Sequence, residues 1–67
     1  MKIEVIVNGE SRELDGGTTL RQLVEQLSLS PEKVAIELNR RLARGDRLDM
    51  PLNGGDVIEI VTFVGGG

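Results

Sequence analysis

Three consecutive glycines, Gly65, Gly66 and Gly67, end the sequence and are its clearest chemical feature. Glycine has no Cβ, so such a run can enter a narrow channel in any backbone conformation and present a carboxylate at its tip. A carboxylate on a tether is a substrate rather than a catalyst, because another protein can activate it as an acyl-adenylate for attack by a sulfur or amine nucleophile. Glycine runs are also ordinary linker material, so composition alone leaves a functional tail and an inert tail equally open.

The rest of the chain lacks most of the groups that catalysis uses. The 67 residues include no Cys, His, Trp or Tyr, and the only aromatic residue is Phe63. Thiolate nucleophiles, cysteine-based zinc sites and imidazole acid/base catalysis are therefore excluded. A chain of this length forms one domain and buries roughly 60% of its unfolded surface, so a deep catalytic pocket is not expected. We predict that the protein is not an enzyme and binds no cofactor.

The charge of the chain argues against polyanionic partners. Eight Lys and Arg residues against eleven Asp and Glu residues give a net charge of −3, which opposes binding to nucleic acids or to anionic membrane surfaces. No stretch approaches the roughly 20 apolar residues of a membrane span, and the first residues do not resemble a signal peptide. We expect a cytoplasmic protein with neither a nucleic acid nor a membrane as partner.

The last apolar run, residues 57–64, predicts a strand that is buried on both faces or lies at an interface. Side chains alternate along a strand, so two sets face opposite ways: Ile58, Ile60 and Thr62 on one face, and Val57, Glu59, Val61 and Phe63 on the other. Since a single helix can cover only one face, we predict that Val61 and Phe63, with Ile6, form an exposed patch beside the tail. A partner would bind there. The alternative is that Phe63 fills a gap in the core.

A cationic segment, residues 40–47, contains four arginines, which are Arg40, Arg41, Arg44 and Arg47. Such a segment is usually a solvated loop, and Asp46 and Asp49 offset part of its charge. The second interpretation is a site for an anion or a partner. The sequence leaves both open.

The elements that must position these groups follow from periodicity. Residues 2–7 alternate as a strand, Asn8-Gly9 is typical of a two-residue hairpin turn, and residues 10–14 can return as a second strand. Leu20, Leu23, Val24 and Leu27 then lie on one face of a short helix. Thr19 and Gln22 have the spacing of a capping box, which places the start of the helix at Thr19, with Thr18 as the alternative cap.

The second half alternates strands with turns. Ser30-Pro31 stops the helix or begins a short turn, and residues 34–38 predict a third strand. Residues 40–52 are read as irregular, apart from a short strand near Leu42. A turn at residues 53–56 leads into the last strand. The order predicts an α+β protein in which one helix covers one face of a mixed sheet of four to five strands. If the last strand lies beside the first, the two are parallel, which is the β-grasp (ubiquitin-like) arrangement.

With these elements placed, the whole chain resembles the ThiS family, the ubiquitin-like sulfur carriers of thiamine biosynthesis. Four segments carry the resemblance, and the last is the most specific: Lys2 to Gly9, Gly17-Thr18-Thr19-Leu20 leading to Leu23-Val24, Val34 to Asn39, and Gly55 to Gly67. Residues 40–52 match only loosely. The resemblance implies a β-grasp domain over residues 1–64 and a flexible glycine tail at residues 65–67.

The resemblance also implies a chemistry for the tail. In the family, a ThiF-type adenylyltransferase uses ATP and Mg²⁺ to adenylate the terminal glycine, here Gly67, while Gly65 and Gly66 enter its active-site channel. A sulfur donor such as a cysteine desulfurase then allows conversion to a thiocarboxylate, and a ThiG-type thiazole synthase takes the sulfur. Two alternatives stay open: a carrier similar to the small subunit of molybdopterin synthase, and a β-grasp module that binds partners without any covalent step.

Overall fold

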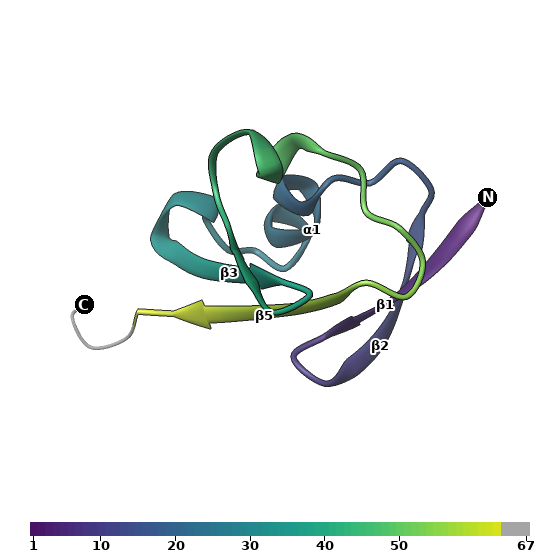
Figure 1. Cartoon of the computed structure of the whole chain (residues 1–67), viewed down its shortest axis with the longest axis horizontal. Helices are drawn as coiled ribbons and strands as arrows, with labels where there is room; N and C mark the ends of the chain where they lie inside the picture. Colours follow the sequence, from purple (N-terminus) through teal and green to yellow (C-terminus); the bar gives the residue numbers. More distant parts are fainter. Residues whose placement is uncertain (64–67) are drawn as a thin grey trace.

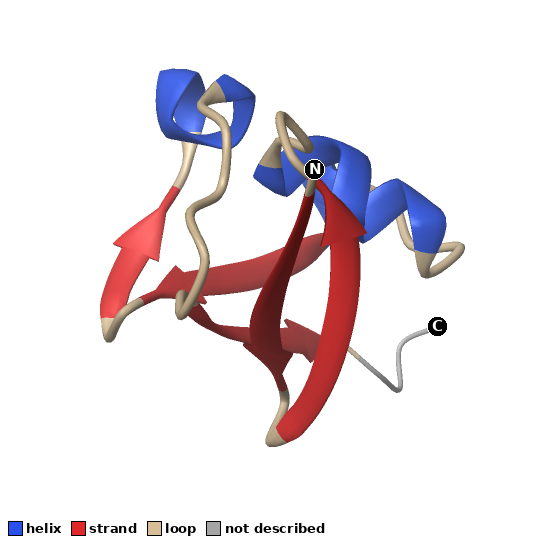
Figure 2. Ribbon diagram, turned by 90° about the vertical axis from the view of Figure 1, so that its right-hand side faces the viewer, coloured by secondary structure: helices blue, strands red, loops and turns tan. Residues whose placement is uncertain are grey.

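Within residues 1–63, which the computed structural model describes, five strands form one mixed sheet and one α-helix packs on one of its faces (Figure 1 and Figure 2). The elements in chain order are β1 (Lys2–Val7), β2 (Glu10–Asp15), α1 (Leu20–Gln26), the 3₁₀ helix η1 (Pro31–Lys33), β3 (Val34–Leu38), β4 (Arg41–Ala43), the 3₁₀ helix η2 (Gly45–Asp49) and β5 (Val57–Thr62). The order of strands in the sheet is β2-β1-β5-β3-β4. The predicted β-grasp arrangement is therefore confirmed.

The hairpin of β1 and β2 turns at Asn8 and Gly9, as predicted. Their φ angles of 50° and 85° are the left-handed values that a two-residue hairpin turn requires. Val7 pairs with Glu10 on either side of the turn. The turn fixes the register of β2 and so places Leu14 in the core.

The last strand runs beside the first and parallel to it, with Ile6 opposite Val57. On its other side β5 pairs antiparallel with β3, and β3 pairs antiparallel with the edge strand β4. β5 is thus the central strand of the sheet.

The helix α1 begins at the predicted capping box. The Thr19 hydroxyl accepts a hydrogen bond from the Gln22 amide at 3.1 Å, and the Gln22 side chain accepts one from the Thr19 amide at 2.9 Å. Thr18 is not the cap, because its hydroxyl donates to the Asp15 carbonyl at 2.7 Å. The helix ends at Gln26, well before Pro31, which instead begins η1. Of the two readings of Ser30-Pro31, the short turn is correct.

The core between the helix and the sheet is entirely aliphatic. Its buried members are Val5, Val7, Leu14, Leu20, Leu23, Val24, Ile36, Ala43, Leu48, Leu52, Ile58 and Ile60. Of the two predictions for residues 57–64, burial on both faces is wrong, since Ile58 and Ile60 are buried while Val57, Glu59 and Val61 are exposed. One helix covers one face only, so the alternate side chains of β5 meet solvent. The strand ends at Thr62, and Val64 lies outside the described residues.

Residues 40–52 contain more structure than the sequence predicts. The short strand near Leu42 is confirmed as β4, but η2 was not predicted. Leu48 on η2 and Leu52 beyond it are both buried. The Leu52 amide donates to the Thr18 carbonyl at 2.8 Å, which ties this segment to the start of α1.

Asn8 connects the hairpin to β5 through its side chain. Its Oδ1 accepts a hydrogen bond from the Ile60 amide at 2.8 Å, and its Nδ2 donates to the Ile60 carbonyl at 3.3 Å. β1 ends at Val7, so no β1 backbone group is available to pair with Ile60. The Asn8 side chain makes these two hydrogen bonds instead and fixes this part of β5.

We therefore predict that Asn8→Ala lowers the free energy of unfolding by about 1–3 kcal/mol, because it removes two hydrogen bonds and places alanine at a positive φ. Chemical denaturation measures this change. The matched control is Asn53→Ala, since the Asn53 side chain is exposed and takes part in no hydrogen bond within residues 1–63. Equal stability of the two variants would contradict the prediction.

Candidate functional site

The candidate site is the exposed face of the sheet around the end of β5. Figure 1 shows β5 running to the end of the molecule opposite the amino terminus. Phe63 follows the strand and is the last described residue. Gly65, Gly66 and Gly67, the residues predicted to react or to enter a partner's channel, lie outside the described residues. The described part of the site is therefore the surface from which the tail departs.

Val61 and Phe63 are both exposed, with 58% and 71% of their surfaces accessible to solvent. Val61 lies opposite Ala35 of β3, on the sheet face away from α1. The prediction that these two side chains face solvent is confirmed, and the alternative that Phe63 fills a gap in the core is wrong. Binding of a partner at this surface stays a prediction.

Ile6 is on the same face but is not next to these residues. It lies opposite Val57, four residues before Val61 along β5, which corresponds to about 13 Å at the usual rise of a strand. Ile6 is also only partly exposed, whereas Val57 is 42% exposed. Val61 and Phe63 are thus both exposed at the end of β5, and Ile6 is separate from them.

Leu42 of β4 belongs to the same face and was not among the predicted site residues. Leu42 pairs with Glu37, which in turn pairs with Glu59 of β5. Its side chain is 60% exposed. The sequence did contain one signal, the turn at Asn39-Arg40. In the structure both turn residues have positive φ. A two-residue turn fixes the register of the strands on either side, and so it fixes which β4 residues share a face with Glu37.

Glu37 and Glu59 stand directly opposite each other on this face. In residues 1–63 neither carboxylate has an ion-pair partner. Two like charges at directly opposed positions of an antiparallel pair repel each other.

We expect Glu59→Gln to raise the free energy of unfolding by about 0.2–1 kcal/mol, because it removes one charge of this opposed pair. Thermal and urea unfolding at low ionic strength measure the gain. Glu13 on β2 likewise lies opposite another glutamate, Glu4, so the variant Glu13→Gln offers a second test of the same effect. Loss of stability in Glu59→Gln would show that the carboxylate is stabilised by a contact other than those described.

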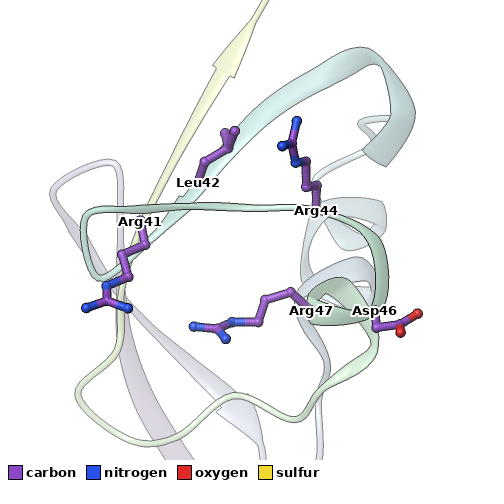
Figure 3. A pocket seen from close by; sticks show the side chains of 5 residues that line it. All are labelled: Arg41, Leu42, Arg44, Asp46 and Arg47. Carbon is purple, nitrogen blue, oxygen red and sulfur yellow. The ribbon is translucent and has the colours of Figure 1, made fainter.

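The cationic segment forms a hollow beside β4. Its lining residues are Arg41, Leu42, Arg44, Asp46 and Arg47, around a volume of about 420 Å³ (Figure 3). Arg40 is not part of this lining, because it lies in the turn before β4. Three of the four arginines in the sequence cluster are therefore brought together by the fold.

Two ion pairs within residues 1–63 lie away from the end of β5. Lys2 Nζ is 2.6 Å from Asp15 Oδ1, and Arg21 Nε is 2.8 Å from Asp49 Oδ1. The hydrogen bond from Lys2 lowers the pKa of Asp15, and the hydrogen bond from Arg21 lowers the pKa of Asp49. All four groups are solvated, so these pairs contribute little to stability. The Arg21 pair joins η2 to α1.

The described residues offer no metal site and no spanning helix. Residues 1–63 contain no group of three or more Asp or Glu side chains placed to hold a metal ion. The same residues form no helix that is long and apolar enough to cross a membrane. What the described residues offer is an exposed, partly apolar sheet face at the end of β5.

Comparisons with known proteins point to one family. The ThiS family model matches residues 5–67. The sulfur carrier protein ThiS of Thermus thermophilus is 39% identical over 64 residues, which cover 94% of this chain and 98% of that protein. A protein named thiazole synthase from Magnetococcus marinus is 41% identical over 66 residues, but this chain spans only 20% of its length.

Two solved structures have a similar fold. The thiamine biosynthesis protein ThiS of Geobacter metallireducens superposes with a TM-score of 0.75 at 29% identity, over 97% of this chain and 100% of that chain. A chain from the complex of subunits 1 and 2 of the molybdopterin-converting factor of Helicobacter pylori gives a TM-score of 0.57 at 30% identity, with both chains fully covered.

Proposed function

This chain belongs to the ThiS family of sulfur carriers, and we propose that the carboxyl group of Gly67 carries the sulfur as a thiocarboxylate used to form the thiazole of thiamine. The observation that carries the proposal is the family match over residues 5–67, which includes the three glycines. The fold supports it, because the last element before the tail in the sequence is β5, the central strand of the sheet.

The first proposed step is adenylation by a ThiF-type adenylyltransferase. A carboxylate oxygen of Gly67 attacks the α-phosphorus of ATP, a new P–O bond forms, and pyrophosphate leaves. ATP and Mg²⁺ belong to that enzyme. In this proposal the groups that orient the phosphates and stabilise the transition state also belong to the enzyme.

The second proposed step replaces AMP by sulfur. Hydrosulfide attacks the Gly67 carbonyl carbon; a persulfide from a cysteine desulfurase attacks the same carbon but forms an acyl disulfide, whose S–S bond two thiols must then reduce to release the thiocarboxylate. The C–S bond forms, the bond to AMP breaks, and with hydrosulfide one proton is released without any change of redox state. The absence of Cys from this chain means that no internal thiol can compete for the activated carboxyl.

The proposed acceptor is a ThiG-type thiazole synthase. The support is that a region similar to this chain makes up a fifth of a protein named thiazole synthase. We place these reactions in the cytoplasm, where ATP is available to the adenylyltransferase.

A carrier similar to the small subunit of molybdopterin synthase is the second candidate, favoured by the structural likeness to the molybdopterin-converting factor complex. The higher TM-score with ThiS favours the thiamine role. A non-covalent interaction module is the third candidate, and it predicts no change of Gly67 at all.

The experiment that tests the proposal uses the full chain, first loaded with sulfur by a ThiF-type adenylyltransferase, ATP, Mg²⁺ and sulfide. The loaded chain is then offered in parallel to a thiazole synthase and to a molybdopterin synthase large subunit. We expect consumption of the thiocarboxylate only with thiazole synthase and its substrates. Consumption only with the molybdopterin enzyme would overturn the thiamine assignment.

A further inference from the structure

The arginine hollow borders the surface around Val61. The last β3–β4 pair is Ile36 with Ala43, so the same register, continued by one residue, puts Arg44 near Ala35, whose partner on β5 is Val61. Two strand spacings separate Arg44 from Val61, or about 10 Å. A stable interface covers about 800 Å² on each partner, equivalent to a disc of about 16 Å radius. A protein centred on Val61 and Phe63 therefore also covers Arg44.

The hollow is cationic although the chain as a whole is acidic. Residues 40–49 carry four arginines against two aspartates, in a chain with a net charge of −3. One of the two aspartates, Asp49, is already paired with Arg21. Figure 3 shows the carboxylate of the other, Asp46, directed away from the side chain of Arg47. Within residues 1–63 the side chains of Arg41, Arg44 and Arg47 make no ion pair and no hydrogen bond.

The directions of the three side chains indicate the shape of the ligand. In Figure 3, Arg41 and Arg47 lie on one side of the β4 chain, while Arg44 lies on the other, beside Leu42. The three guanidinium groups therefore do not converge on one point, as they would around a single phosphate. Carboxylates spaced along a protein segment can pair with them one by one as the segment crosses the edge strand.

We propose that Arg41, Arg44 and Arg47 bind an acidic segment of the same protein that docks on Val61 and Phe63. This inference rests on the sulfur-carrier function proposed above, in which that protein is the adenylyltransferase. The exposed Leu42, between Arg41 and Arg44 in sequence, gives the segment an apolar contact. The arginines strengthen docking of the carrier and speed its encounter with the enzyme, since complementary charges attract the two surfaces before they touch.

The test compares the wild-type chain with the triple variant Arg41→Gln, Arg44→Gln, Arg47→Gln. Binding to a ThiF-type adenylyltransferase is measured over a range of salt concentrations, and thiocarboxylate formation is measured at saturating enzyme. We expect about tenfold weaker binding at low salt, from three exposed pairs of about 0.5 kcal/mol each. The salt dependence should decrease, and thiocarboxylate formation at saturation should be unchanged.

Matched variants separate charge from structure. Arg12→Gln, on the opposite edge strand β2, should bind as the wild type does. The triple Arg→Lys variant should retain most of the affinity because it keeps the charges. The single variant Arg44→Gln, measured alongside, keeps the test valid if the triple variant has an altered melting temperature.

Three outcomes would overturn the inference. The first is a triple variant that keeps the wild-type affinity and salt dependence and is still loaded with sulfur. The arginines would then serve only to keep the edge strand β4 from pairing with other chains, and the proposed function would stand. Saturable binding of inorganic phosphate or ATP to the wild-type chain alone, lost in the triple variant, would assign the hollow to a small anion. Absence of both binding and loading in the wild type would reject the proposed function together with this inference.

Discussion

Removal of Gly67 is expected to abolish thiocarboxylate formation and to leave the melting temperature unchanged. The carboxyl of residue 66 would then end the tail one residue short, roughly 3.5 Å from where the partner's active site needs it. A displacement of this size in a reacting group costs at least about a hundredfold in rate. The fold does not depend on Gly67, because the core is formed by side chains between Val5 and Ile60.

The measurements are sulfur loading by mass spectrometry and thermal unfolding by circular dichroism. Gly67→Ala restores the length of the chain but adds a Cβ beside the reacting carbonyl, and we expect it to fail as well. The control is a chain extended by one glycine, which keeps the run of glycines but moves the carboxyl. Loading of the shortened chain at the wild-type rate would contradict the assignment of Gly67.

Phe63→Asp is expected to weaken binding to the adenylyltransferase about 30-fold without unfolding the protein. Truncation of a central aromatic contact in an interface costs at least about 2 kcal/mol, and the new charge must also be desolvated. Phe63 is 71% exposed in the free chain, so its replacement should change the free energy of unfolding by no more than about 0.5 kcal/mol.

Isothermal titration with the enzyme and urea unfolding of the free chain provide the two readings. The matched control is Met50→Asp, because Met50 is an apolar residue of similar exposure, 54%, that follows η2 and lies outside the sheet face. Equal affinities of the two variants would show that Phe63 is not part of the docking surface. Unfolding of Phe63→Asp would place this side chain in the core instead.

Local patterns predicted the parts of the fold that local interactions determine. Asn8-Gly9 specified the hairpin, and Thr19 with Gln22 specified the start of the helix, because each motif satisfies its own backbone groups within four residues. Connectivity predicted that β1 and β5 would be parallel if they were neighbours, and the structure shows that they are. The same reasoning predicted that one face of β5 is exposed once a single helix is available to cover the sheet.

The parts that sequence reasoning missed depend on contacts between distant residues. The 3₁₀ helix η2 is five residues long and buries one side chain, Leu48, so it has no periodicity to detect. Its contacts with the start of α1 are distant in sequence. Arg21 Nε donates a hydrogen bond to the Asp49 carboxylate, and the Leu52 amide beyond η2 donates one to the Thr18 carbonyl. Contacts across some 30 residues of sequence have no local signature.

The composition of the candidate site was predictable only in part. Val61 and Phe63 could be assigned from the alternation of one strand. Separating Ile6 from them, and adding Leu42, required the register of three strand pairings. A shift of one residue in any of these pairings would have moved the side chains to the opposite face.

The central claim is that the Gly67 carboxyl carries sulfur, and intact mass spectrometry tests it most directly. The chain is incubated with ATP, Mg²⁺, a ThiF-type adenylyltransferase and a sulfur source, and the product is fragmented to locate any change. We predict replacement of one oxygen by sulfur, localised to Gly67 and dependent on ATP. An unchanged mass with several adenylyltransferases that load their own carriers would contradict the claim and favour a non-covalent binding module.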